Sequence, residues 1–306
     1  MAGWAAETIQ STEKLESQMR VTAPSPPVVP LQERHLDELV DFLEADPVAN
    51  LHLLALVDRG SLSQDARGTW TAVRHASGRL RAVLYMRRSL DGGAALSAVP
   101  VGEPAACTIL GQRLRRRGGS RLLVGDRAAC DATWIGMGKP WFRISYDQRL
   151  YVCTDIPEGP RLEVEPARPS DVADLVPMHA RMLEEDLQVP RDQIDPLAQW
   201  AQLQRVVSVG RMFVVRSEDS LDPLKFCIDI GDPSQRGTQV GGTYVPDGYR
   251  GQGVATRAMR AICAMLLGER GVPYVTLHVH ENNLPAVRCY EGSGFRPATA
   301  FRLMVR

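Results

Sequence analysis

A glycine-rich turn beside an arginine is the segment of this sequence best suited to hold an anion. The chain reads Tyr249-Arg-Gly-Gln-Gly-Val-Ala-Thr256, and a strand-like run ends just before it at Pro246. A helical pattern follows, with apolar residues every three or four positions from Ala255 onward. The first amides of a helix lack partners within it and lie at the positive end of its dipole. We therefore expect this turn to bind a phosphate or diphosphate, although the glycines could instead only shape the turn.

A second group of residues has the spacing of one face of a short helix. Asn283, Ala286 and Tyr290 lie three and four positions apart, and Gly294-Phe295 begins the next apolar run. Asn283 is suited to cap the helix. Tyr290 is either a half-buried core aromatic or a proton donor, because a phenol keeps its proton at neutral pH and can stabilise a developing anion.

Together the two segments resemble the acyl-CoA-binding motifs of the GCN5-related N-acetyltransferase (GNAT) superfamily. The first matches Arg-x-x-Gly-x-Ala at a strand-to-helix junction, and the second matches Asn-x-x-Ala-x-x-x-Tyr-x-x-x-Gly-Phe. The resemblance implies an N-acetyltransferase that uses acetyl-CoA and no metal. The CoA-binding residues that it implies are Tyr244, Val245, Arg250, Gly251, Gln252, Gly253, Val254, Ala255, Thr256 and Asn283.

The resemblance also implies direct transfer from acetyl-CoA to an amine, with Tyr290 protonating the departing thiolate. An ammonium acceptor must first lose a proton to a base. The groups that could take it are Glu184, Glu185, Asp229, His278 and His280. The two glutamates are our candidate catalytic residues beside Tyr290, but they could equally be solvated surface charge, and the histidines could be structural. The acceptor, a small-molecule or peptide amine, cannot be named from the residues.

The elements expected around these residues occur in the same order in both halves of the chain, which is a sign of duplication. In the first half we expect helices at residues 36–43, 48–57, 105–117 and near 127, and strands at 69–74, 80–87, 94–99, 121–124 and 150–153. In the second half we expect helices at 171–187, capped by Ser170, and at 199–209, with strands at 162–166, 212–216, 226–230, 238–245 and 272–279. The pattern predicts an α/β (α+β) protein with two GNAT-like domains, each a mixed, largely antiparallel twisted sheet flanked by helices.

Composition suggests where these domains begin and end. Residues 1–27 have the polar, proline-ended make-up of a disordered tail, and residues 155–160 that of a linker. We therefore expect a first domain at 28–157 and the catalytic domain at 158–306. The first domain has Glu103 where a phosphate would need amides, so we interpret it as a degenerate GNAT-like domain. Its segment Leu43-Glu-Ala-Asp-Pro-Val-Ala-Asn50 resembles one found in bacterial tandem-GNAT proteins.

Charge and cysteine usage limit the other functions. The 306 residues carry 36 basic and 36 acidic side chains, so no global charge attracts nucleic acid or a membrane surface. The six cysteines are scattered, and neither a signal peptide nor a membrane-spanning run is evident, so we expect a cytoplasmic protein without membrane partners. A basic cluster at residues 113–121 leaves open an aminoacyl-tRNA-dependent acyltransferase, with tRNA as partner. A non-catalytic acyl-CoA sensor is the other alternative, and the sequence does not predict the oligomeric state.

Overall fold

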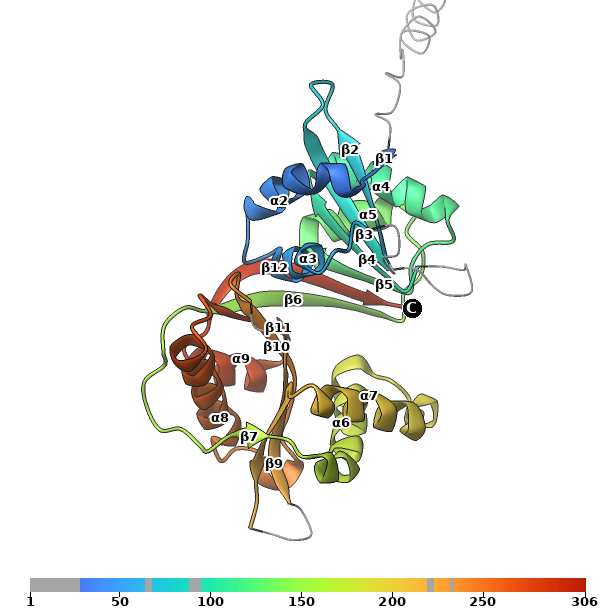
Figure 1. Cartoon of the computed structure of the whole chain (residues 1–306). Helices are drawn as coiled ribbons and strands as arrows, with labels where there is room; N and C mark the ends of the chain where they lie inside the picture. Colours follow the sequence, from blue (N-terminus) through green and yellow to red (C-terminus); the bar gives the residue numbers. More distant parts are fainter. Residues whose placement is uncertain (1–27, 64–67, 88–94, 219–222, 232–233) are drawn as a thin grey trace, which may run out of the picture.

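A continuous mixed sheet forms the centre of the molecule (Figure 1). The computed structural model describes residues 28–63, 68–87, 95–218, 223–231 and 234–306, so the tail expected at 1–27 lies outside the described residues. Within them the sheet has 12 strands in the order β1-β2-β3-β4-β5-β12-β6-β11-β10-β9-β8-β7. Most neighbouring strands are antiparallel, and helices cover both faces, which confirms the predicted fold class.

The elements follow the predicted order. The first half contains β1 (Val28–Pro30), α2 (Leu36–Glu44), α3 (Leu51–Asp58), β2 (Gly68–Arg74), β3 (Leu80–Arg87), β4 (Ser97–Gly102), α4 (Pro104–Arg116), β5 (Leu122–Asp126), α5 (Arg127–Gly136) and β6 (Ile144–Cys153). The second contains β7 (Glu165–Pro166), α6 (Val172–Leu187), α7 (Pro196–Ser208), β8 (Met212–Arg216), β9 (Leu224–Ile230), β10 (Thr238–Tyr244), α8 (Val254–Cys263), β11 (Val275–His280), α9 (Leu284–Gly292) and β12 (Arg296–Val305).

Several boundaries differ from the sequence-based expectation. The strand expected at 162–166 is reduced to the two residues of β7. The cap of α6 is Asp171 and not Ser170, and the Asp171 carboxylate accepts hydrogen bonds at 3.0 and 2.9 Å from Arg216 on β8. Helix α7 begins at Pro196, where the Asp195 side chain accepts from the amide of Leu197 and caps the helix.

Strands β6 and β12 cross between the two halves. β6 precedes the linker in sequence, yet it pairs with β11 and β12, for example through Thr276↔Val152. β12 closes the second half in sequence, yet it pairs with β5 of the first half, for example through Leu303↔Val124. Each half therefore completes its sheet with a strand of the other. The division at residue 157 remains a prediction, and the sheet itself is continuous across it.

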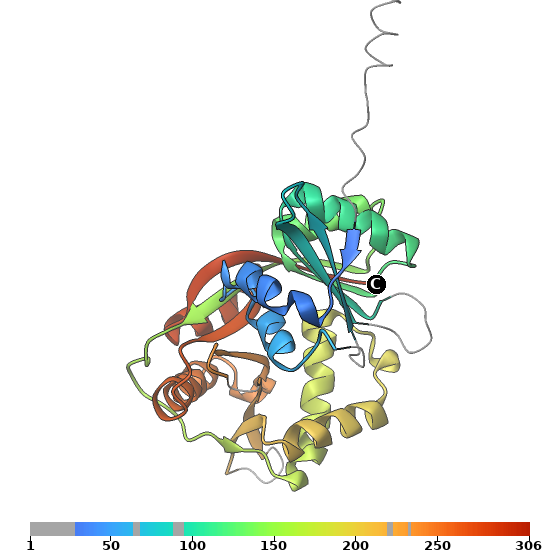
Figure 2. The ribbon, with the colours of Figure 1, turned by 45° about the horizontal axis from the view of Figure 1, so that its top comes forward.

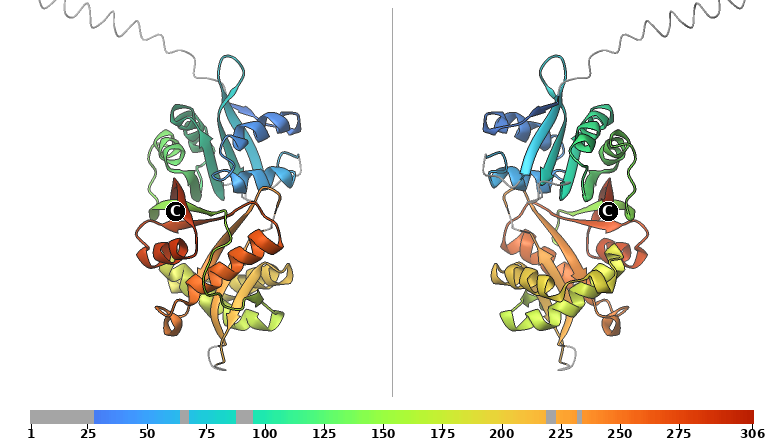
Figure 3. Two further views of the ribbon diagram at one scale, coloured as in Figure 1. Left: turned by 90° about the vertical axis from the view of Figure 1, so that its left-hand side faces the viewer. Right: turned by 90° about the vertical axis from the view of Figure 1, so that its right-hand side faces the viewer.

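Each half packs one pair of helices on either face of the sheet (Figure 2). In the first half, α2 and α3 cover one face, while α4 and α5 cover the other. In the second half, α6 and α7 share a core with β8 to β10, and α8 packs on the opposite side (Figure 3). The faces carrying α6, α7 and α3 therefore meet where the two halves join.

Helices α4 and α5 of the first half are in backbone contact. A Cβ added at Gly111 would overlap the carbonyl oxygen of Thr133, and one added at Gly136 would overlap that of Thr108. The turn before α4 is also short, because Gly102 ends β4 and Pro104 already begins the helix. Only Glu103 lies between the end of the strand and the start of the helix. The degeneracy of the first half stays a prediction.

Candidate active site

The parallel strands β10 and β11 pair only at their first residues. Their register is limited to Thr238↔Val275 and Gln239↔Thr276. Further along, β10 is bulged between Gly241 and Tyr244, where Gly242 has a φ of +61°. The peptide groups at the end of β10 on the side of β11 are thus left out of the ladder. They are available to hydrogen-bond an extended ligand lying between the two strands.

The glycine turn after β10 has the geometry of an anion site. Gly251 and Gly253 adopt φ values of +73° and +71°, which favour glycine, and Gly253 directly precedes α8. Both glycines are exposed, and a Cβ added to either would meet nothing within 4 Å. The first amides of α8 therefore face open space, which is what a diphosphate requires at a helix start.

A cavity of ≈ 510 Å³ opens beside this turn. We call it the carrier cavity, after the acyl carrier CoA that the two sequence motifs predict here. It is bordered by the end of β10, the start of α8, the inner face of α9 and the last turn of α6. The predicted residues that line it are Glu185, Tyr244, Val245, Arg250, Gly251, Gly253, Val254, Ala255, Thr256, Asn283 and Tyr290. Two predicted residues do not line it. Gln252 turns back to donate to the carbonyl of Gly248 at 2.8 Å, and Glu184 pairs with Arg181 and Arg191.

Helix α9 carries the two predicted residues of the second motif. The Asn283 side chain caps this helix by accepting from the amide of Ala286 at 3.2 Å, and it also borders the carrier cavity. Tyr290 lies two turns further along the helix and lines the same cavity as Thr243 of β10. Burial raises the pKa of Tyr290, so the phenol carries its proton across the physiological range. A protonated hydroxyl inside this cavity can donate to a nearby anion.

Arg250 stands at the mouth of the carrier cavity in a charged cluster. Its guanidinium pairs with Glu185 at 2.8 Å and with Asp247 at 3.0 Å, and it donates to the carbonyl of Val245 at 2.9 Å. It also stacks over the Tyr244 ring at 5.2 Å. A diphosphate at the glycine turn would compete with the two carboxylates for Arg250.

Asp186 is a cavity residue that sequence reasoning missed. It follows Glu185 on α6 and borders the carrier cavity together with Tyr290. Desolvation raises the pKa of Asp186, and the neighbouring charge of Glu185 raises it further. The signal was present in the sequence, because Asp186 lies one helical turn after Met182 and so shares its face, whereas Glu184 points elsewhere.

The remaining candidate bases are engaged in structural contacts. Asp229 on β9 pairs with Arg211 at 2.8 Å. His278 packs on Phe301 with ring centroids 4.5 Å apart, and desolvation lowers its pKa to about 4. The rings of His280 and Tyr146 pack edge to face, with their centroids 4.2 Å apart.

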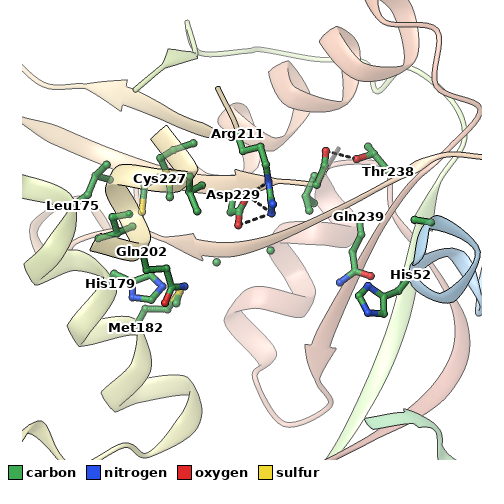
Figure 4. Close-up of a pocket in the computed structure, with 18 of the residues that line it drawn as sticks. His52, Leu175, His179, Met182, Gln202, Arg211, Cys227, Asp229, Thr238 and Gln239 are labelled. Atoms are coloured by element: carbon green, nitrogen blue, oxygen red, sulfur yellow. Dashed lines mark hydrogen bonds and ion pairs between the residues drawn. The ribbon is translucent and has the colours of Figure 1, made fainter. Parts of the chain in front are cut away.

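A second cavity, of ≈ 470 Å³, lies on the α6 and α7 side of the sheet, and we call it the junction pocket (Figure 4). Its floor is formed by β8, β9 and β10, and Asp229 and Arg211 lie there as an ion pair. His179 and Gln202 line one end. His52, from helix α3 of the first half, lies at the other end.

We also searched the described residues for a metal site, a membrane-spanning helix and a basic surface near either cavity. Those residues include no group of His, Cys, Asp and Glu arranged to hold a metal ion. None of the described helices has the length and apolar character to cross a membrane. The basic cluster lies in the last turn of α4 and just after it, and it borders neither the carrier cavity nor the junction pocket.

Comparison with known proteins agrees with this geometry. Residues 195–295 match the family described as Acetyltransferase (GNAT) family. A GCN5-related N-acetyltransferase from Sphaerobacter thermophilus superposes with a TM-score of 0.62 at 14% identity, covering 92% of this chain and 96% of that one. A GNAT-family acetyltransferase from Colwellia psychrerythraea gives 0.54 at 11% identity, covering 92% and 100%.

A tandem GNAT protein from the clavulanic acid biosynthesis pathway also superposes, with a TM-score of 0.53 at 16% identity over 92% of this chain and 98% of that one. No curated protein matches the sequence. The likeness in structure extends over both halves, whereas the family match covers only residues 195–295, which include the glycine turn and all of α9. The chain therefore has the GNAT fold and contains a domain of the acetyltransferase (GNAT) family.

Proposed function

We propose that this protein is an acyl-CoA-dependent N-acyltransferase that moves an acetyl group from acetyl-CoA to a small-molecule or peptide amine. One observation carries the proposal. The exposed helix start after Gly253 opens onto the same cavity that Tyr290 faces from α9. A diphosphate anchor and a protonated hydroxyl in one cavity suit a long thioester carrier with its reactive end inside the protein.

The carrier's diphosphate would bind the amides of residues 251–256, with Arg250 exchanging its carboxylate partners for phosphate oxygens. The pantetheine arm would lie along Tyr244 and Val245, at the unpaired edge of β10. Asn283 lines the cavity opposite this edge and would contact the same arm. This arrangement would direct the thioester toward Tyr290.

Transfer would occur directly, with both substrates bound. The amine nitrogen forms a bond to the thioester carbonyl carbon, whose oxygen is stabilised by an amide near Val245. The carbon–sulfur bond then breaks, and Tyr290 donates its proton to the sulfur. Asp186 or Glu185 takes the proton that the amine loses. Of these two carboxylates, we favour Asp186, because its raised pKa makes it the better proton acceptor and because its charge acts on Tyr290.

The state of the cysteines supports the cytoplasmic location predicted from the sequence. The six cysteines are free, five of them buried. Unpaired buried thiols suit a reducing compartment such as the cytoplasm.

The test is binding and turnover of acetyl-CoA by the full chain. Calorimetry is expected to show one acetyl-CoA bound per chain, with a rise in the unfolding temperature, because a ligand that binds only the folded state stabilises it. A panel of amines is then screened for release of free CoA thiol. Failure to bind acetyl-CoA would overturn the proposal. Tight binding without thiol release from any amine would favour the acyl-CoA sensor, and salt-sensitive retention of tRNA would favour the tRNA-dependent enzyme.

A further inference from the structure

The junction pocket is built by both halves of the chain. The second half supplies α6, α7 and the strand floor. The first half supplies Leu51, His52 and Ala55 of α3 and Arg59 just after the helix. A smaller cavity of ≈ 240 Å³ shares His52 with it and continues between the two halves toward Phe301. Helix α3 therefore forms one wall of a space whose floor belongs to the catalytic half.

Helix α3 contacts the second half at both of its ends. Just before the helix, the carbonyl of Pro47 accepts a hydrogen bond at 3.1 Å from the Tyr274 hydroxyl. At its far end, Asp58 pairs with Arg236 at 3.1 Å, and the same guanidinium binds Glu44 at the end of α2. The turn before α3 is the segment singled out in the sequence at residues 43–50. These contacts fix the wall of the pocket in place.

The junction pocket adjoins the carrier cavity through two elements. On α6, Met182 lines the pocket, and Asp186, one turn later, lines the carrier cavity. On β10, Gly242 lines the pocket, and the next residue, Thr243, lines the carrier cavity beside Tyr290. An amine lying in the pocket would thus reach the thioester at the bulge of β10. Its opposite end would point toward α3.

The end of the pocket near α3 offers uncharged hydrogen-bonding groups. Figure 4 shows His52 from α3 beside Gln239 from β10, and both residues line the pocket. Desolvation lowers the pKa of His52, and the charge of Arg59 lowers it further, so the ring is neutral at pH 7. The charged groups are engaged, since Arg211 binds Asp229 and Arg59 has an interaction partner.

We propose that the junction pocket is the acceptor site, and that His52 of the first half and Gln239 of the second together select an amine bearing uncharged hydroxyl or amide groups. The assignment rests on the proposed N-acyltransferase function. A volume of ≈ 470 Å³ suits a ligand of the size of an amino sugar or a dipeptide amide. The first half then contributes to the acceptor specificity of the enzyme.

The experiment compares four amines at saturating acetyl-CoA by release of CoA thiol. Glucosamine supplies hydroxyls, glycylglycinamide supplies amides, hexylamine supplies neither, and glucosamine 6-phosphate adds a second charge. We expect kcat/KM for glucosamine or glycylglycinamide to exceed the values for both hexylamine and glucosamine 6-phosphate by about tenfold or more, the worth of one buried hydrogen bond. The preferred compound distinguishes a hydroxyl-bearing from an amide-bearing acceptor.

Variants of the first half test whether α3 takes part. His52→Leu is expected to raise KM for the preferred amine about tenfold while leaving KM for acetyl-CoA unchanged. The matched control His75→Leu lies on the exposed turn after β2 and should change neither value. Ala55→Trp fills the pocket and should abolish acceptor use but keep acetyl-CoA binding. Ala105→Trp, at an exposed position of α4, is its control for size.

The outcomes separate the two proposals. If acetyl-CoA does not bind the wild-type chain, the proposed function fails. If acetyl-CoA binds and some amine of the wider panel is acetylated, three results each overturn the acceptor assignment alone. They are turnover of none of these four amines, hexylamine or glucosamine 6-phosphate as the best substrate, and unchanged kinetics in both His52→Leu and Ala55→Trp. Retained acetyl-CoA binding by Ala55→Trp shows that the variant has folded.

Discussion

Tyr290 faces the carrier cavity with its proton retained, because burial raises its pKa. We expect Tyr290→Phe to lower kcat about 100-fold, the usual worth of a general acid, with little change in acetyl-CoA affinity. Steady-state kinetics with the amine found by screening would measure kcat, and calorimetry the affinity. Tyr85→Phe, which removes a hydroxyl in the first half, is the control. Unchanged kcat in Tyr290→Phe would refute the acid role.

Asp186 gives a prediction for the pH dependence of turnover. A base must be deprotonated to act, and a raised pKa means that Asp186 takes up its proton at a higher pH than an ordinary aspartate. Activity should therefore decline as the pH falls through this raised value, at a pH above the usual 3.8. Asp186→Asn should lower kcat at every pH and remove this acid limb from the profile.

The control for Asp186 is Asp41→Asn, at an exposed position of α2. It should leave the profile of kcat against pH unaltered. If the acid limb of Asp186→Asn coincided with that of the wild type, Asp186 would not be the base. Glu185→Gln would then be examined in the same way.

Single-residue roles were predictable from the sequence where they follow from local backbone geometry. Gly253 and Asn283 fall in this class, because a turn and a helix cap need only near neighbours. Asp186 was missed because the sequence places it on the same helix face as Met182 but does not show where that face points after packing. The pairing of Glu185 with Arg250 was not predictable either, since it joins residues from distant parts of the chain.

At the level of elements, the turn before α8 depends on glycine. Gly253→Ala would force a Cβ into a left-handed conformation at a cost of about 1–2 kcal/mol. We expect the turn to relax away from its anion-binding shape, and the acetyl-CoA dissociation constant to rise about tenfold by calorimetry.

Gly210 provides a matched control for this change. It has a similar φ of +68°, lies in the turn after α7, and has open space at its Cβ position. Gly210→Ala should lower the free energy of unfolding by a comparable amount, yet leave acetyl-CoA affinity unchanged. Equal losses of affinity in both variants would mean that general destabilisation, and not the shape of the turn, explains the effect.

Helices were predicted more completely than strands, for physical reasons. The amphipathic stripe of α8 is local information, and it places Met259 and Ile262 in the core as expected. Strand β6 extends back to Ile144, well before the expected start at 150, because pairing with β11 and β12 on both sides holds polar residues such as Gln148 in the sheet. Pairing with strands distant in sequence leaves no periodic signal.

For the whole molecule, the exchange of β6 and β12 predicts one cooperative folding unit. A fragment of residues 158–306 would lack β5 and β6, so β12 would lose both of its neighbours and β11 would keep only β10. We expect this fragment, expressed alone, to show no cooperative thermal transition by calorimetry. Mixing it with a fragment of residues 1–157 should restore part of the transition. Separate, sharp transitions for the two fragments would contradict this expectation.

The order of elements in both halves was predictable, but the joining of the halves was not. Repeated patterns of strands and helices indicate a duplicated fold, and each pattern is complete in itself. Which partner a terminal strand selects depends on the competition between two similar sheet edges, those of β5 and β11. Only the folded structure reveals the choice.

The same exchange constrains how the protein can fold during its own synthesis. When β5 leaves the ribosome, its final neighbour, β12, has not yet been translated, and most of the second half must be made first. Until β12 is made, the edge of β5 in the nascent first half is therefore unpaired. Unpaired strand edges are surfaces on which unwanted strand pairing begins. We infer that mutations slowing the arrival of β12 would cause aggregation of new chains, even where the finished protein is stable.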